Sequence, residues 1–219
     1  MAVYGGERVA MSILKKFYQN TRRPEGLGGR VMLSMMNFGH NANALWGLSH
    51  IEIAPAARIL DIGCGGGKNI GNLLGRAPQG RVWGVDYAQE SVEKSERTNK
   101  RAVLQGRAKV VQASVSSLPF EDGEFDVATA FETIYFWPEL LHDFVEVRRV
   151  LKAGGVFLIC NEAARPEGWE KWTQMLDLSV YTKENLSRIL LEAGFCSVSC
   201  DEHTNGKWLC VTAQKPGGP

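Results

Sequence analysis

The sequence lacks the long apolar runs of a membrane protein, because no stretch approaches the roughly 18 residues that cross a bilayer. It also lacks a large net charge of either sign, because 25 Lys+Arg against 24 Asp+Glu leave a formal charge of only +1. No global field would therefore hold DNA, RNA or an anionic membrane surface. We expect no nucleic-acid partner and no membrane partner, and the 219 residues predict one main domain.

Cysteine is scarce, and the spacing of the cysteines does not suggest disulfide or metal-binding pairs. The five cysteines are an odd number, and those near the C-terminus form no C-x-x-C pair. We therefore expect reduced thiols and no metal site. Charged residues interrupt the first twenty positions, which do not resemble a secretory signal, so we expect a cytoplasmic protein.

The pattern of apolar residues divides the chain into two parts. Residues 1–50 combine an amphipathic helical stretch, a turn-rich stretch and a second apolar segment, and they predict a helical N-terminal cap or lid. Residues 51–219 form the predicted main domain. There, short β-branched runs alternate with helical ones, which is typical of βαβ units. The predicted strands are Arg58–Asp61, Val82–Asp86, Lys109–Gln112, Phe125–Phe131 and Val156–Asn161.

Helices are predicted between these strands at Lys68–Gly75, Ser91–Leu104 and Glu139–Leu151. In the last of them we expect Asp143, Glu146 and Arg149 to face solvent. Its apolar face would hold Leu140, Leu141, Phe144, Val145 and Leu151.

The C-terminal part ends the alternation. Thr182 can cap a helix that ends at Gly194. Cys196–His203 and Lys207–Gln214 then predict a hairpin around Asn205-Gly206. The fold class expected is α/β: a Rossmann-like, doubly wound, seven-stranded and mostly parallel sheet with an antiparallel C-terminal hairpin.

A glycine-rich motif follows the first predicted strand, in the run Asp61-Ile62-Gly63-Cys64-Gly65-Gly66-Gly67. Glycines at this place let a ligand lie on the backbone where a strand turns into a helix, although a tight turn alone would also need them. The third glycine of a dinucleotide fingerprint would fall at position 68, which is lysine. Asp61 would repel a pyrophosphate and suits a ligand with a cationic amine.

A second acid, Asp86, ends the next predicted strand. Its carboxylate offers two acceptor oxygens to the two hydroxyls of a ribose. Tyr87, which follows it, can lie along a base. Capping of the next helix by Asp86 and ordinary packing of Tyr87 are the alternatives.

Four segments in this order resemble the class I S-adenosylmethionine-dependent methyltransferases, over about residues 55–200. They are DIGCGGG (61–67), VDYA (85–88), SLPFEDGEFDV (117–127) and EVRRVLKAGGVFLI (146–159). Met36-Asn37-Phe38-Gly39-His40 is similar to a segment of the ubiquinone and menaquinone C-methyltransferases.

The resemblance implies S-adenosylmethionine as cofactor, with S-adenosylhomocysteine as product. Gly63, Cys64 and Gly65 would hold its methionine end, and Asp61 would lie near the ammonium group. Asp86 would bind the ribose, and Tyr87 would flank the adenine. Where the family often has an acid for the adenine amino group, this chain has Ser114, a weaker neutral acceptor. The implied cofactor residues are Asp61, Gly63, Cys64, Gly65, Asp86, Tyr87, Ser114, Val115 and Phe131.

Three side chains are candidates for accepting a proton from the methyl acceptor. Glu132 and Tyr135 follow the fourth predicted strand at the edge where ligands sit in open α/β sheets, and His40 belongs to the predicted cap. A hydrogen bond to backbone for Glu132 and a purely structural role for His40 are the alternatives.

The function predicted is methyl transfer to a small-molecule acceptor. The pattern fits carbon, nitrogen, oxygen and sulfur acceptors equally, because one scaffold hosts them all. A non-catalytic cofactor-binding module is the first alternative. An NAD-dependent oxidoreductase is the second, against which Lys68 and Asp61 argue.

Overall fold

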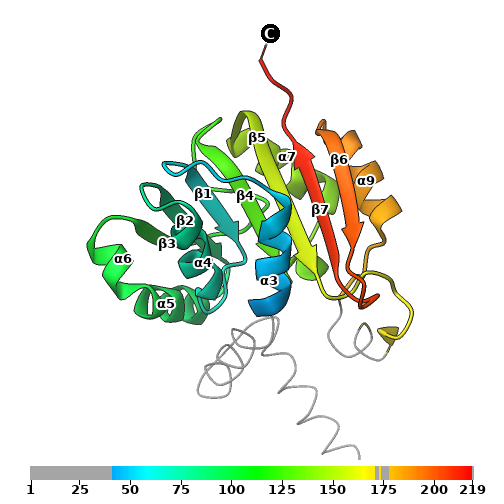
Figure 1. The fold of residues 1–219 in the computed structure, drawn as a ribbon, viewed down its shortest axis with the longest axis horizontal. Helices are drawn as coiled ribbons and strands as arrows, with labels where there is room; N and C mark the ends of the chain where they lie inside the picture. Colours follow the sequence, from blue (N-terminus) through cyan, green and yellow to red (C-terminus); the bar gives the residue numbers. More distant parts are fainter. Residues whose placement is uncertain (1–40, 171–172, 174–177, 219) are drawn as a thin grey trace, which may run out of the picture.

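A seven-stranded sheet forms the centre of the molecule (Figure 1). The computed structural model describes residues 41–170, 173 and 178–218. The strand order is β3-β2-β1-β4-β5-β7-β6. Only β7 runs against its neighbours, so the predicted α/β class and antiparallel hairpin are confirmed. The strands are β1 (Arg58–Ile62), β2 (Arg81–Asp86), β3 (Ala108–Gln112), β4 (Phe125–Phe131), β5 (Leu151–Asn161), β6 (Cys196–Glu202) and β7 (Leu209–Gln214).

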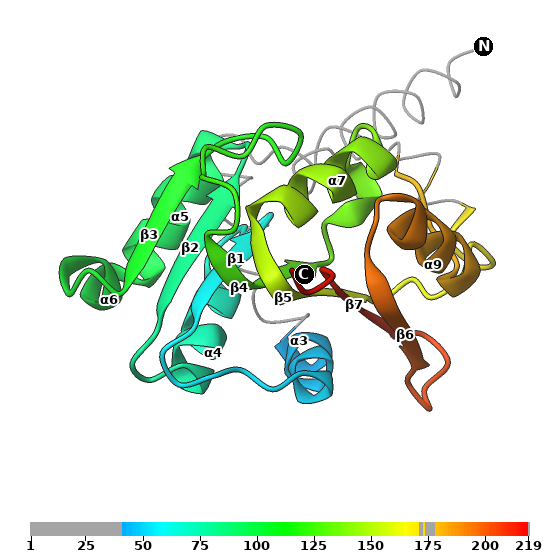
Figure 2. The ribbon, with the colours of Figure 1, turned by 90° about the horizontal axis from the view of Figure 1, so that it is seen from above.

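Helices cover both faces of this sheet, α3 and α4 on one and α7 and α9 on the other (Figure 2). Alternate residues of the central strands enter two separate apolar cores, as the period of a strand requires. The helices are α3 (Asn41–Gly47), η1 (Leu48–His50), α4 (Lys68–Arg76), α5 (Gln89–Thr98), α6 (Lys100–Leu104), η2 (Ile134–Phe136), α7 (Leu140–Val150) and α9 (Lys183–Glu192).

Two predicted elements differ from the structure by more than a residue or two. The helix expected over Ser91–Leu104 is broken at Asn99, because the buried side chain of that residue donates to the carbonyl oxygens of Gly67 and Ser95, at 2.8 and 3.0 Å. The strand expected from Val156 begins earlier, at Leu151, which pairs with Phe125 across a register shift.

The polar side chains of α7 do not face solvent as expected. Asp143 is fully buried, and one of its oxygens accepts a hydrogen bond from Ser116 Oγ at 2.6 Å. Leu141 and Val145, expected in the core, are 39% and 43% exposed. The reason is the segment between β3 and β4, which lies along this face of α7 and whose backbone needs polar partners.

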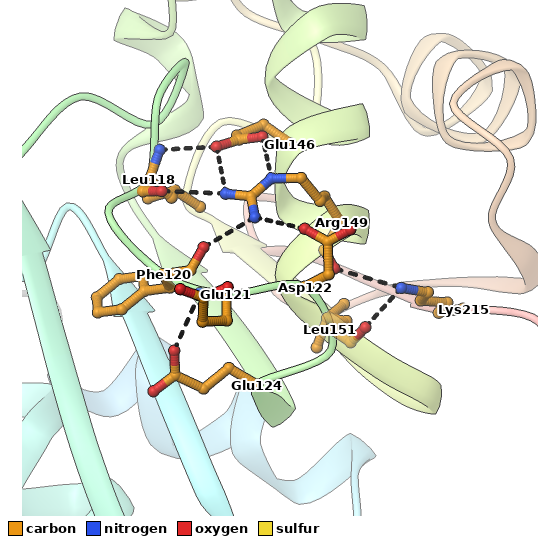
Figure 3. A network of polar contacts seen from close by, with 9 residues as sticks. All are labelled: Leu118, Phe120, Glu121, Asp122, Glu124, Glu146, Arg149, Leu151 and Lys215. Atoms are coloured by element: carbon orange, nitrogen blue, oxygen red, sulfur yellow. Dashed lines mark hydrogen bonds and ion pairs between the residues drawn. The ribbon is translucent and has the colours of Figure 1, made fainter.

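Arg149 is the centre of that contact (Figure 3). Its guanidinium donates to the carbonyl oxygens of Leu118 and Phe120, at 3.0 and 2.8 Å, and pairs with Asp122 at 2.7 Å. Glu146 accepts from the same guanidinium and from the backbone N–H of Leu118, both at 2.8 Å. The α7 helix therefore fixes the segment that leads from β3 to β4.

Residues 41–50 of the predicted cap pack on the sheet. A side chain at Gly47 would collide with Cys160 on β5, because a Cβ there would lie 2.7 Å from Sγ. This close approach makes α3 part of the helical layer. The remainder of the predicted cap, including His40, lies outside the described residues, and its action as a lid stays a prediction.

The C-terminal helix and hairpin are confirmed, although β6 ends at Glu202, one residue before His203, and β7 begins at Leu209, two residues after Lys207. Thr182 caps α9 in a capping box with Asn185. Gly194 follows the helix with φ of 87°, as a left-handed C-terminal residue should. No helix among the described residues is long and apolar enough to cross a membrane.

Candidate functional site

The candidate site lies at the carboxyl edge of the sheet, where β1, β2, β3 and β4 end side by side. Asp61 is in register with Gly84 on β2 and with Thr129 on β4. Asp86 is in register with Gln112 on β3. The topology therefore brings Asp61, Asp86 and the residues after β3 and β4 to one place, as the order of the motifs indicates.

The loop after β1 is held against β2. The backbone N–H groups of Gly63 and Cys64 both donate to the carbonyl oxygen of Val85, at 2.7 and 3.0 Å. Gly63 has φ of 72°, and a Cβ there would lie 2.1 Å from the Oγ1 of Thr133. Only glycine fits this position, so the backbone forms a surface on which a ligand can lie closely.

Asp61 lies under this loop with its carboxylate buried. Its Oδ1 accepts from Thr129 Oγ1 at 2.9 Å, whereas Oδ2 has no hydrogen-bond partner among the described residues. The pKa of Asp61 is raised from 3.8 to about 7, chiefly by burial; the bond from Thr129 lowers it, and the nearby Asp86 carboxylate adds a smaller rise. A cationic group beside Oδ2 would satisfy this oxygen and stabilise its negative charge.

Asp86 fixes the same loop from the next strand. One carboxylate oxygen accepts from the N–H of Gly65 at 2.9 Å, and the other accepts from the N–H of Ala88 at 3.0 Å. Burial raises the pKa of Asp86, and these bonds oppose the rise. A carboxylate has about four acceptor positions, so capacity remains for the hydroxyls of a ribose. No side chain caps α5, whose N-cap residue is Ala88, so the alternative of a helix cap at Asp86 is not borne out, and the ribose site stays a prediction.

The other predicted cofactor residues surround these acids at different depths. Tyr87 is 45% exposed, and Ser114 is exposed beyond the end of β3, where its Oγ accepts from the N–H of Ser116 at 3.2 Å. Val115 is buried beneath it. The Phe131 side chain packs in the core on the face that carries α3 and α4, so its backbone is the part nearest to the edge.

These residues fit the cofactor that the resemblance implies. The amino acid end of S-adenosylmethionine carries an ammonium group, which suits the unpartnered oxygen of Asp61. Its ribose carries two hydroxyls, which suit Asp86. The glycine loop between them offers backbone where any larger residue would collide with Thr133.

Glu132 and Tyr135 come together after β4. The Tyr135 hydroxyl donates to a Glu132 carboxylate oxygen at 3.2 Å and accepts from the N–H of Ala163 at 3.0 Å. Glu132 is one of two non-glycine residues with left-handed backbone in the described part of the chain, at φ of 55°. Burial and the charge of Glu132 hold the pKa of Tyr135 well above its usual range, so the phenol keeps its proton and is unsuited to act as a base.

Sequence reasoning missed three polar residues at this edge. Thr129 donates to Asp61, and Thr133 faces Gly63. Asn161 ends β5, and its buried Oδ1 has no partner in the described structure. A lone threonine inside the apolar strand Phe125–Phe131 was the available signal for Thr129. The other two lie where strand becomes loop, and the sequence pattern does not single them out.

No three potential metal ligands gather within the described ranges. The expectation of a site without metal stays a prediction.

Known proteins resemble this chain over its central part. Residues 60–159 match the family described as methyltransferase domain. Squalene methyltransferase 1 of Botryococcus braunii is 35% identical over 109 residues, which are 50% of this chain and 29% of that protein. The chain thus spans less than a third of the length of this curated relative.

Solved structures resemble it over more of its length. A SAM dependent methyltransferase from Aquifex aeolicus superposes with a TM-score of 0.71 at 18% identity, covering 84% of this chain and 97% of that one. Geranyl diphosphate C-methyltransferase from Streptomyces coelicolor A3(2), solved with Mg2+, geranyl diphosphate and S-adenosyl-L-homocysteine, gives 0.68 at 15% identity, covering 80% of each chain. At these identities the likeness is one of fold.

Proposed function

We propose that the protein binds S-adenosylmethionine and methylates a small-molecule acceptor, because residues 60–159 match the methyltransferase domain family. The observation that carries the proposal is the pair of buried acids around the glycine loop. Asp61 keeps an unpartnered oxygen where an ammonium group fits, and Asp86 holds the loop while retaining acceptor capacity.

When bound, S-adenosylmethionine supplies an electrophilic methyl group on a sulfonium. The residues of the chain then have to position an acceptor and keep water away, since in-line transfer needs little covalent help from the protein. Glu132 accepts the proton that the acceptor loses. Tyr135 stays protonated, and His40 is retained as a second candidate base.

We propose an apolar acceptor that reacts at carbon. Two of the reported relatives support this choice, one named for squalene and one for geranyl diphosphate. The loop after β4 agrees with it, because Tyr135, Phe136 and Trp137 follow Glu132 directly. Aromatic rings give an apolar acceptor a surface to pack on, and their negative faces favour positive charge that develops on it.

Titration calorimetry with S-adenosylhomocysteine tests the cofactor site. Asp86→Asn should weaken binding about 10- to 100-fold, the scale of hydrogen bonds to a charged acceptor. The control is Asp201→Asn, on the exposed end of β6, which should bind like the unmodified protein. Micromolar binding of NADH in place of S-adenosylhomocysteine would overturn the proposal.

Transfer itself is tested with cofactor that carries a labelled methyl group. Squalene, geranyl diphosphate and a sterol are offered first, followed by a fractionated metabolite extract. We expect label in an apolar product, with Glu132→Gln lowering kcat about 10²- to 10⁴-fold. Label in a polar amine or hydroxyl compound alone would refute the acceptor class, and tight cofactor binding without any transfer would favour a non-catalytic binding module.

A further inference from the structure

Tyr135 connects three segments that are separate in the sequence. Its hydroxyl touches Glu132 after β4 and the N–H of Ala163 after β5, at 3.2 and 3.0 Å. Its backbone carbonyl accepts from the N–H of Ser179 at 3.0 Å. The side chain is only 7% exposed, so these bonds lie away from bulk water, where they are strongest.

The hydrogen bond from Ala163 fixes the direction in which the Tyr135 hydroxyl can donate its own hydrogen. The N–H of Ala163 can only donate, so the oxygen of Tyr135 must accept there and point its own hydrogen elsewhere. A carboxylate oxygen of Glu132 accepts that hydrogen. A carboxylate can only accept, so the chain of bonds from Ala163 through Tyr135 favours an ionised Glu132.

Glu132 is held from its backbone as well. Its N–H donates to the carbonyl oxygen of Cys160 at 3.0 Å, and its φ of 55° turns the chain sharply out of β4. Left-handed backbone at a residue with a side chain persists only where the surroundings impose it, and such positions gather at functional sites. The backbone of Glu132 and the Tyr135 phenol therefore hold the Glu132 carboxylate from both sides.

We propose that Tyr135 is a positioning residue, whose hydroxyl orients the Glu132 carboxylate toward the methyl acceptor and keeps it ionised to accept a proton. The inference rests on the proposed function and deepens it. It assigns to the loop after β5, through Ala163, a part in setting the proton affinity of a group on the loop after β4.

Other groups near Glu132 affect its charge, and they stay in place when Tyr135 is changed. These include Cys160 on β5, which interacts electrostatically with Glu132, while Glu162, directly after β5, interacts with Tyr135. The thiol is neutral because burial raises its pKa. Glu162 acts on the Tyr135 phenol, and a Tyr135 variant leaves the Glu162 side chain in place.

The test compares Tyr135→Phe with Tyr181→Phe, a partly buried tyrosine packed on the core that contains Ile134 and Trp137. Carbon NMR of protein with labelled glutamate carboxyl groups follows the titration of Glu132, whose signal is assigned from Glu132→Gln. Tyr135→Phe should move that titration to higher pH by about 0.5–1 unit, the scale of one lost hydrogen bond to a carboxylate. Tyr181→Phe should leave it in place. An unmoved titration in Tyr135→Phe would overturn the proposal, and this readout needs no acceptor.

Turnover gives the second readout, with the acceptor identified by labelled methyl transfer. Tyr135→Phe should lower kcat about tenfold with KM nearly unchanged, and the acid limb of the pH–rate profile should move to higher pH with the NMR titration. Equal losses at every pH would mean a merely structural role. Binding of S-adenosylhomocysteine should equal that of the unmodified protein, so a failure of the cofactor proposal would be recognised separately.

Discussion

Polar groups at the amino edge of the sheet are paired with one another, whereas several at the carboxyl edge have no partner in the described structure. At the amino edge, Arg149, Glu146 and Asp122 share one network with the backbone between β3 and β4 (Figure 3). At the carboxyl edge, Asp61 Oδ2, Asn161 Oδ1 and Asn43 Nδ2 are buried and unpartnered.

The difference separates what holds the fold from what awaits a ligand. A satisfied network stabilises and fixes the chain, while each buried polar atom without a partner costs stability until something binds to it. The division has one exception, because the Nε of Arg148, which packs on Gly194, is also unpartnered. Substitutions at the carboxyl edge should therefore change binding, whatever they do to stability, and those at the amino edge should change stability alone.

The largest effect is expected at Gly63. In Gly63→Ala, the new Cβ would lie 2.1 Å from Thr133 Oγ1 at a φ of 72°. Backbone strain and overpacking together should cost about 3–6 kcal/mol and abolish cofactor binding. Gly106→Ala is the control, because φ there is 66° and nothing lies within 4 Å. Chemical denaturation and calorimetry measure both, and equal losses in the two variants would contradict the steric argument.

Asp61→Asn should stabilise the free protein and weaken cofactor binding. The pKa of Asp61 is raised from 3.8 to about 7, so between these values the unfolded chain is ionised while the folded one keeps its proton. This group therefore lowers stability as pH rises from about 4 to 7. Asn carries no charge, so the variant should gain about 4 kcal/mol over the unmodified protein near pH 8 and almost nothing near pH 4. Urea unfolding across this range is the measurement, and a gain that does not grow with pH would contradict the assignment.

Arg149→Met should lower stability with little change in the cofactor affinity of the folded protein. The substitution removes the guanidinium N–H groups that donate to Glu146 and to the carbonyl oxygens of Leu118 and Phe120. Because the guanidinium is partly exposed, we expect the free energy of unfolding to fall by about 2 kcal/mol, which is less than the full cost of breaking a buried pair. Arg97→Met, which breaks an exposed pair with Glu93, should lose less than about 0.5 kcal/mol. A large loss of affinity in Arg149→Met would break the division between the edges.

Thr182→Ala should have the smallest effect. It removes the capping box at the start of α9, which costs about 1 kcal/mol. Thermal unfolding measures this loss, and kcat should not change. A change in kcat would contradict the expectation that this cap acts on stability alone.

The fold could be predicted from the sequence because its signals are local. Strand Phe125–Phe131 begins and ends where its apolar pattern does, and Asn205-Gly206 marks the hairpin. The break at Asn99 could not be predicted, since it depends on the carbonyl oxygen of Gly67, 32 residues away. The burial of Asp143 likewise depends on Ser116, in a segment whose path no periodicity describes.

The cofactor side of the candidate site followed from motifs, and the acceptor side did not. Asp61, Gly63 and Asp86 stand at strand ends, where parallel topology brings them together. The link from Tyr135 to Ala163 joins two loops through one hydroxyl, and it depends on where each loop turns. Such contacts depend on tertiary packing, which the spacing of residue types along the sequence does not predict.

The reversed direction of β7 has a practical consequence. Because β7 runs against β5, the chain leaves the sheet at the amino edge, where Lys215 Nζ donates to the carbonyl oxygen of Leu151 at 2.7 Å (Figure 1). A dye, a peptide tag or a solid support attached at Gly218 would therefore lie near the amino edge of the sheet. The glycine loop after β1, at the opposite edge, would remain exposed to the solution. Immobilised protein prepared in this way should present its binding edge to every small molecule that flows past.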